Sequence, residues 1–279
     1  MQRRTALTLI EVLVVLAASA ALAAALAMSH REAFSNKTRH ECASNLRGIG
    51  QAQYIYAQDD PQTFTAYGGV RKENDGAMRL FDPKSRKDVP DINGLPSPTV
   101  DLWMLIRVNN TTPRQFVCPA TKDVEDKVTD ATKYWDFGKR ENLSYAYLYQ
   151  HDPDLENVST SSHPLIPIMA DGNPYLRGKI DAKPLDDRNS DARGNSTNHG
   201  RNKRPGQNVL YQDSHVNFET SPSVGLSGRF SPELKKSNGR DNIYTMNAAG
   251  ADALVDPGDA SPTPKLCNPA SSSDAVLVP

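Results

Sequence analysis

The feature that most constrains this chain is an apolar run near its N-terminus, from Leu7 to Met28, whose one charged residue is Glu11. As an α-helix this run would be about 33 Å long, enough to cross the ~30 Å hydrocarbon core of a membrane. A carboxylate inside such a run is costly unless a partner compensates it, so Glu11 is a candidate functional residue. Two arginines in the short segment before the run, Arg3 and Arg4, favour a cytoplasmic N-terminus.

The start of the apolar run carries a short motif. Residues 6–11 read Ala-Leu-Thr-Leu-Ile-Glu and follow a basic leader, residues 1–6. This pattern resembles the processing signal of the type IV prepilin and type II secretion pseudopilin family, which usually reads Gly-Phe-Thr-Leu-x-Glu. The resemblance implies that a prepilin peptidase cleaves between Ala6 and Leu7 and methylates the new amine of Leu7. It also implies that Glu11 pairs with this amine of a neighbouring subunit.

Two other interpretations of the N-terminus stay open. A secretory signal peptide would also begin with basic residues, and residues 25–27 (Ala-Leu-Ala) have the small-x-small pattern of a cleavage site. Its apolar region, however, is usually only about 7–15 residues long and would not contain Glu11. A plain membrane anchor fits the hydropathy but gives no reason for Glu11. In both cases the chain would be a secreted or membrane-anchored periplasmic binding protein or enzyme.

Helical patterning continues beyond the apolar run. Residues suited to a buried stripe recur at spacings of three and four: Phe34, Thr38, Cys42, Leu46, Ile49, and then Gln53 or Tyr56. The first proline after the run is Pro61. We therefore predict one helix from about Leu7 to about Ala57, with residues 7–28 in a membrane or filament core and residues 29–59 as an amphipathic continuation. Residues 41–52 also resemble a Cys-x-x-Asn-Leu-Lys-x-Ile-Gly motif of pseudopilin-like proteins.

The rest of the chain predicts an α+β, pilin-like fold, in which the long helix packs on a small antiparallel β-sheet head with long loops. The head would span residues 60–247, and the Ala, Pro, Ser and Asp composition of residues 248–279 predicts a disordered tail. Alternating or apolar runs predict strands at residues 143–149, 164–170 and 207–218, and a short strand at residues 115–119. Residues 102–108 fit a short helix or a strand.

A second motif lies near the C-terminus. Asn198 and His199 are followed by a spacer and then by Asn-Val-Leu-Tyr-Gln-Asp-Ser-His-Val at residues 208–216. This resembles the His–spacer–Asp-Gly motif of a large group of bacterial pseudopilin-like proteins, with Ser214 in place of the glycine after Asp213. His199, Asp213 and His215 could form a zinc or acid–base site. We favour the alternative that a buried His–Asp hydrogen bond locks the hairpin.

The same resemblance makes calcium a candidate ligand, because major pseudopilins of type II secretion bind calcium in a C-terminal loop. Calcium takes oxygen ligands, and the chain offers these: Asp171, Asp187, Asn189, Asp191 and Asp213. Residues 187–191 begin like an EF-hand loop, but Ala192 and Asn198 stand where the glycine and the bidentate glutamate belong. The alternative is a set of solvated Asx turns. We predict no other cofactor.

The three cysteines, Cys42, Cys118 and Cys267, are too far apart in sequence for a CxxC metal or redox motif. An exported domain permits a disulfide. Cys42 lies on the helical stripe and Cys118 ends an apolar run, so both are expected in one core and are predicted to pair, leaving Cys267 on the tail. The alternative is that each thiol is simply a small buried apolar residue.

Charge and motifs narrow the function. The chain has 32 basic and 33 acidic residues and no nucleic-acid-binding pattern. It also lacks the Gly-x-Ser-x-Gly and His-Glu-x-x-His motifs of hydrolases, so we do not expect an enzyme. The expectation is a structural subunit of a type II secretion or type IV pilus-like filament, single-pass in the inner membrane with its head in the periplasm. Its expected partners are other pilin-like subunits, the prepilin peptidase and the membrane.

Overall fold

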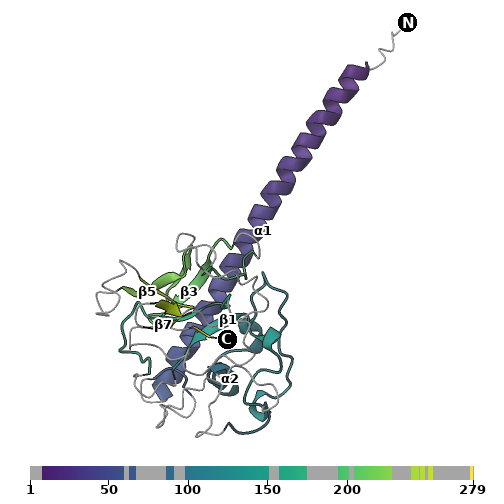
Figure 1. The fold of residues 1–279 in the computed structure, drawn as a ribbon. Coiled ribbons are helices and arrows are strands. Elements are labelled where there is room, and N and C mark those ends of the chain that lie inside the picture. The colour runs from purple at the N-terminus through teal and green to yellow at the C-terminus, as the bar shows by residue number, and fades with distance from the viewer. Residues whose placement is uncertain are drawn as a thin grey trace.

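The computed structural model shows one long helix that projects from a globular head (Figure 1). It describes residues 8–59, 63–66, 86–90, 98–150, 157–174, 194–200, 204–227, 240–244, 246–248, 251–253 and 277–278. Ala6 and Leu7, at the predicted cleavage site, lie outside the described residues, as does Cys267.

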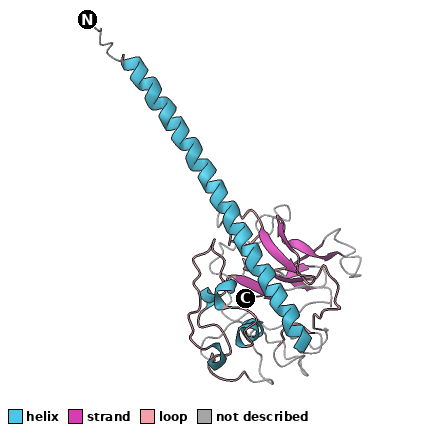
Figure 2. Cartoon of the chain, turned by 180° about the vertical axis from the view of Figure 1, so that it is seen from behind, coloured by secondary structure: helices cyan, strands magenta, loops and turns pink. Residues whose placement is uncertain are grey.

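The long helix, α1, spans Leu9–Asp59 without interruption, close to the predicted bounds. It is about 76 Å long, and its N-terminal half extends clear of the head in both views (Figures 1 and 2). The large apolar side chains of this half are exposed, for example Leu9 at 77% and Leu22 at 63%. Within the described part of the chain, α1 is the one helix long and apolar enough to cross a membrane.

The C-terminal half of α1 runs through the head and carries the predicted buried stripe. Its buried members are Thr38, Cys42, Leu46, Ile49 and Gln53. Phe34 was predicted to belong to this stripe but is 59% exposed. It lies one turn before Thr38, the first residue of α1 that is buried among those described. The N-terminal half of α1 is therefore exposed and its C-terminal half is partly buried, and the change occurs over about one turn before Thr38.

The head contains a five-stranded antiparallel sheet with strand order β4-β3-β2-β1-β9. The strands are β1 (Tyr145–Leu148), β2 (Pro167–Asp171), β3 (Gln207–Tyr211), β4 (Val216–Glu219) and β9 (Leu277–Val278). The predicted strands at residues 143–149 and 164–170 are confirmed, and residues 207–218 form the β3–β4 hairpin. Every residue of β1, β2 and β3 is buried, so these strands are covered on both faces.

Shorter elements complete the head. They are α2 (Pro98–Arg107), the 3₁₀ helices η2 (Pro113–Phe116), η3 (Ala131–Lys133) and η4 (Arg140–Asn142), the pair β5 (Ser223–Ser227) and β6 (Arg240–Asn242), and the pair β7 (Met246–Ala248) and β8 (Ala251–Ala253). The strand predicted at residues 115–119 is wrong. Pro113 opens a 3₁₀ turn there, because its fixed φ suits the first helical position, and Thr112 and Gln115 cap it reciprocally.

The expectation of a disordered tail from residue 248 is also wrong in part. Leu277 is fully buried and pairs with Leu148 of β1. Its N–H donates to the Ile243 carbonyl, and its own carbonyl accepts from Asn173 Nδ2 at 2.8 Å. The average composition of the tail hid this strand, whereas residues 275–278 read Ala-Val-Leu-Val and include good strand formers.

Candidate functional site

The first candidate site is the N-terminal end of α1. The Glu11 carboxylate accepts hydrogen bonds from the Thr8 N–H at 2.7 Å and the Thr8 hydroxyl at 2.9 Å. In return the Glu11 N–H donates to Thr8 Oγ1 at 3.3 Å. These reciprocal bonds form a capping box, which satisfies two N–H groups at the start of the helix. The Thr-x-x-Glu spacing of residues 8–11 is the sequence signal for this role, which the prediction of a partner in a neighbouring subunit did not include.

The second feature is the exposed apolar half of the helix, residues 9–28, here called the apolar arm. Its exposed large side chains are Leu9, Ile10, Val12, Leu13, Val14, Val15, Leu16, Leu22, Leu26 and Met28. Leaving a large apolar side chain in water costs about 1.5–3 kcal/mol relative to burying it. Such side chains are dense from Leu9 to Leu16 and recur at Leu22, Leu26 and Met28, and this much exposed apolar surface is typical of a segment that contacts an apolar environment outside its own chain.

A third candidate lies inside the head and is centred on Asp171 at the end of β2. This carboxylate is fully buried. Its Oδ2 accepts from the Asn208 N–H at 2.6 Å and lies 3.1 Å from His199 Nε2. Its Oδ1 accepts from Asn198 Nδ2 at 3.2 Å. We call Asp171, Asn198, His199 and Asn208 the polar knot. The sequence did not predict this buried His199–Asp171 pair, because the His–Asp hydrogen bond favoured there was one that locks the hairpin.

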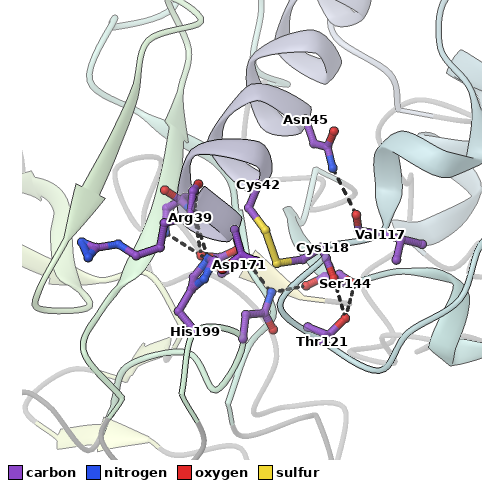
Figure 3. Close-up of a disulfide and its surroundings, with 12 residues drawn as sticks. Arg39, Cys42, Asn45, Val117, Cys118, Thr121, Ser144, Asp171 and His199 are labelled. Atoms are coloured by element: carbon purple, nitrogen blue, oxygen red, sulfur yellow. Dashed lines mark hydrogen bonds and ion pairs between the residues drawn. A yellow bond between two sulfur atoms is a disulfide. The ribbon is translucent and has the colours of Figure 1, made fainter. Parts of the chain in front are cut away.

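The polar knot joins several elements of the head. Asn208 Nδ2 reaches the Arg39 carbonyl of α1 at 3.4 Å, and Asn198 Nδ2 donates to the Ser144 carbonyl just before β1 at 2.8 Å. In Figure 3, Asp171 and His199 lie next to the part of α1 that carries Arg39 and Cys42. The knot therefore fixes both the β2–β3 pairing and the position of α1 against it.

A disulfide between Cys42 and Cys118 lies beside the knot (Figure 3). The two Cα atoms are 5.2 Å apart, so the predicted pairing is present. Both cysteines are fully buried, and Asn45 adds a 3.1 Å hydrogen bond to the Val117 carbonyl next to the bridge. Closing a loop with a sequence separation of 76 stabilises the head by roughly 4 kcal/mol in the chain-entropy model.

The β3–β4 turn holds the other His–Asp pair. Asp213 accepts from the His215 N–H at 3.1 Å, and its carboxylate also bonds to His215 Nδ1. Desolvation acts to raise the pKa of Asp213, but the bonds from His215 outweigh it and hold that pKa below its usual value. The pair locks the hairpin, as favoured from the sequence, although both side chains are partly exposed instead of buried.

The residues predicted to bind a metal do not come together among the described residues. Asp171 lies next to Asn208 at the start of β3, whereas Asp213 follows the end of β3. His199 belongs to the first group and His215 to the second, so the three-residue zinc or acid–base site does not form. The other proposed calcium ligands, Asp187, Asn189 and Asp191, lie outside the described residues.

One set of possible metal ligands does converge, and no local motif predicted it. Ligand atoms of Cys42, Cys118, Asp171 and His199 all lie within 4.8 Å of one another. They come from four segments that are far apart in sequence, and three of the four lie in the buried centre of the head. The sequence singled out each of the four separately, the cysteines as a disulfide pair, Asp171 as a calcium ligand and His199 as part of the C-terminal motif, but it did not join them.

Comparison with known proteins adds no relative from which a function could be transferred. Searches with the chain found no match among protein-family models, curated proteins or solved structures. A function for this chain must therefore be argued from its own residues and their arrangement.

Proposed function

We propose that this chain is a pilin-like structural subunit. Its apolar arm sits in the inner membrane and then packs against the arms of other subunits in a type II secretion or type IV pilus-like filament. The observation that carries the proposal is the single helix α1, exposed and apolar over the arm and then held rigidly in the head. A helix that served only for export or anchoring would not need to continue without a break into the core.

The composition of the arm supports packing between helices. Small residues allow helix backbones to approach closely in an apolar medium, and the arm carries many: Ala17, Ala18, Ser19, Ala20, Ala21, Ala23, Ala24, Ala25 and Ala27. The large side chains at its N-terminal end would cover the outside of such a bundle. The buried disulfide suits a head on the periplasmic side, since that compartment is oxidising.

In this proposal Glu11 changes partners. In the single chain its carboxylate is bonded to Thr8. Cleavage after Ala6 by a prepilin peptidase creates a new amine at Leu7, and in a bundle the carboxylate of Glu11 pairs with the amine of a neighbour. An ion whose partner is removed from a low-dielectric interior is destabilised by roughly 3–5 kcal/mol, so this pair would set the register between subunits.

Substitution of Glu11 tests the proposal. Glu11→Leu makes membrane insertion easier, because it removes a charge from the apolar arm, and is expected to abolish incorporation into filaments. Membrane fractionation measures insertion, and shearing followed by immunoblotting measures assembly. Glu41→Leu is the matched control, since Glu41 is an exposed glutamate of the same helix outside the arm.

The expected outcome is normal insertion of both variants and loss of assembly for Glu11→Leu alone. Normal assembly of Glu11→Leu would mean that the carboxylate serves only the capping box. The proposed register role of Glu11 would then be wrong. A parent chain that never enters the sheared fraction would favour the alternative of a secreted or anchored binding protein or enzyme, because such a protein has no use for a register between arms.

A further inference from the structure

Four side chains from distant segments meet in the head, and two of them are the cysteines of the disulfide (Figure 3). Cys42 comes from α1, Cys118 follows η2, Asp171 ends β2, and His199 lies in the segment before β3. The two sulfur atoms, a carboxylate oxygen and a ring nitrogen all lie within 4.8 Å of one another. Cys42, Cys118 and Asp171 are fully buried, and the His199 side chain is 1% exposed. We propose that this cluster binds one zinc ion when the two cysteines are reduced.

The donor set fits zinc. Two thiolates, one imidazole and one carboxylate form a mixed S₂NO shell, and zinc favours tetrahedral sites built from these groups. Zinc–ligand bonds of about 2.0–2.3 Å place the ligand atoms of a tetrahedron roughly 3.3–3.8 Å apart. The widest separation allowed by the 4.8 Å limit exceeds these values by about 1.0–1.5 Å, a change that side-chain rotation can supply. With four protein ligands and no exposure to solvent, the site would be structural instead of catalytic.

One ring nitrogen of His199 has no hydrogen-bond partner and could bind such an ion. Its Nε2 faces Asp171 and lies 3.0 Å from Asn208 Nδ2, but its Nδ1 is buried without a hydrogen-bond partner. Buried ring nitrogens are nearly always paired, so this one calls for an explanation. The amides of Asn198 and Asn208, which already orient Asp171, would act as the outer-shell hydrogen bonds that position metal ligands.

Disulfide and zinc are alternatives at the same place. In this structure the sulfur atoms are bonded to each other, so they have no thiolate to offer. A dithiol reductant transfers two electrons and two protons to the bridge, becomes a disulfide itself, and leaves Cys42 and Cys118 as thiols. Zinc binding then releases both thiol protons to solvent. A chain that has not yet been oxidised is already in this thiol form. Zinc would thus hold α1 to the head before the disulfide does.

Zinc titration of the full-length chain in mild detergent tests this inference, in a Cys267→Ser background so that only two thiols remain. The chain is unfolded with a dithiol, refolded without oxygen and freed of reductant. Elemental analysis is expected to give one zinc per reduced chain and none per oxidised chain. Cobalt(II), used as a probe, is expected to show thiolate charge-transfer bands and the visible bands of a tetrahedral site.

Variants separate a built site from chelation by two thiols. His199→Gln and Asp171→Asn are expected to weaken zinc binding by about tenfold or more. The double variant Asp213→Asn, His215→Gln removes the other His–Asp pair, which lies outside the cluster, and should bind like the parent. Circular dichroism of the oxidised form checks the fold of each variant, because the disulfide forms without zinc.

Two results would overturn the inference. One is a reduced parent chain that takes up no stoichiometric zinc. The other is unchanged affinity in both His199→Gln and Asp171→Asn, which would leave only adventitious binding to two thiolates. If either variant fails to fold when oxidised, the cobalt spectrum of the parent decides, since the absence of tetrahedral bands also overturns the proposal.

Discussion

Ser214 adopts a left-handed backbone with φ of 68° in the β3–β4 turn, at the place where the resembling motif has glycine. Its N–H donates to the Tyr211 carbonyl at 2.9 Å, and the Tyr211 N–H donates to the His215 carbonyl at 3.0 Å. This is a three-residue hairpin loop whose last residue must be left-handed. Ser214 therefore keeps the turn geometry, at the cost of a strained backbone at a residue that has a Cβ.

Ser214→Gly is expected to stabilise the head by about 1 kcal/mol. The left-handed conformation costs a residue with a Cβ roughly 1–2 kcal/mol, and the buried Ser214 Oγ has no hydrogen-bond partner. The greater freedom of glycine in the unfolded chain offsets part of this gain. Urea unfolding of the full chain in mild detergent measures it. Asn109→Gly is the control, because Asn109 is also left-handed but asparagine tolerates that conformation. A loss of stability in Ser214→Gly would refute the argument.

Asp136 is a buried carboxyl group that should make the stability of the head depend on pH. Burial raises the pKa of Asp136 from 3.8 to about 7, against the hydrogen bonds that it accepts from Thr99 and Phe137. Between these two values the unfolded chain has lost the proton and the folded chain keeps it. The contribution of Asp136 to stability therefore falls as the pH rises from 3.8 to about 7, and stays level above that.

Asp136→Asn should remove this decline. Urea unfolding at pH 5 and at pH 8 is expected to show a smaller loss of stability in the variant than in the parent, and the variant should be the more stable of the two at pH 8. Glu125→Gln, at an exposed carboxylate, serves as the control and should leave the parent's dependence unchanged. The same decline in Asp136→Asn as in the parent would show that other groups cause it.

At the scale of elements, the contact between α1 and the β3–β4 hairpin explains why a glycine lies inside a long helix. A Cβ on Gly50 would lie 3.0 Å from Leu210 Cδ1 and 3.2 Å from Ser214 Oγ. Glycine in a helix costs about 1 kcal/mol relative to alanine, and this close approach is the compensation. The polar knot and the disulfide then fasten the same helix at Arg39 and Cys42, about two to three turns earlier.

Gly50→Leu is expected to destabilise the head by about 2 kcal/mol or more, because the added side chain forces the helix away from the hairpin. Gly50→Ala should have a smaller effect, since better helix propensity opposes a mild clash. The midpoint of urea unfolding measures both, with Ser44→Leu on an exposed position of the same helix as control. If Gly50→Leu matched Ser44→Leu, the helix and hairpin would not be in close contact.

At the scale of the whole molecule, the sequence predicts the long helix and the main strands, but it predicts few of the contacts between residues that are distant in sequence. The bounds of α1 and the three main strands follow from local periodicity and from the absence of proline before Pro61. The Cys42–Cys118 bridge was predictable because each cysteine ends or joins an apolar stripe that must face the core. These signals depend only on neighbours in the sequence.

The remaining features depend on contacts between distant residues. No local pattern links His199 to Asp171, because they are 28 positions apart in the sequence. The strand at Leu277–Val278 was hidden within a polar tail. Glu11 is the reverse case. Its predicted partner was the amine of another subunit, whereas its partner within the chain is Thr8, three residues away. The residues of the site beside the helix were thus each predictable from the sequence, but which of them lie together is set by the three-dimensional fold.

The central claim is that the chain is processed and assembled as a pilin-like subunit through its apolar arm. The most direct test is mass spectrometry of the N-terminal peptide of the chain recovered from the inner membrane of a host that contains a prepilin peptidase. We predict that the mature chain begins at Leu7 with a methylated amine. A mature chain that begins at Met28, or one that keeps its leader uncleaved, would contradict the claim.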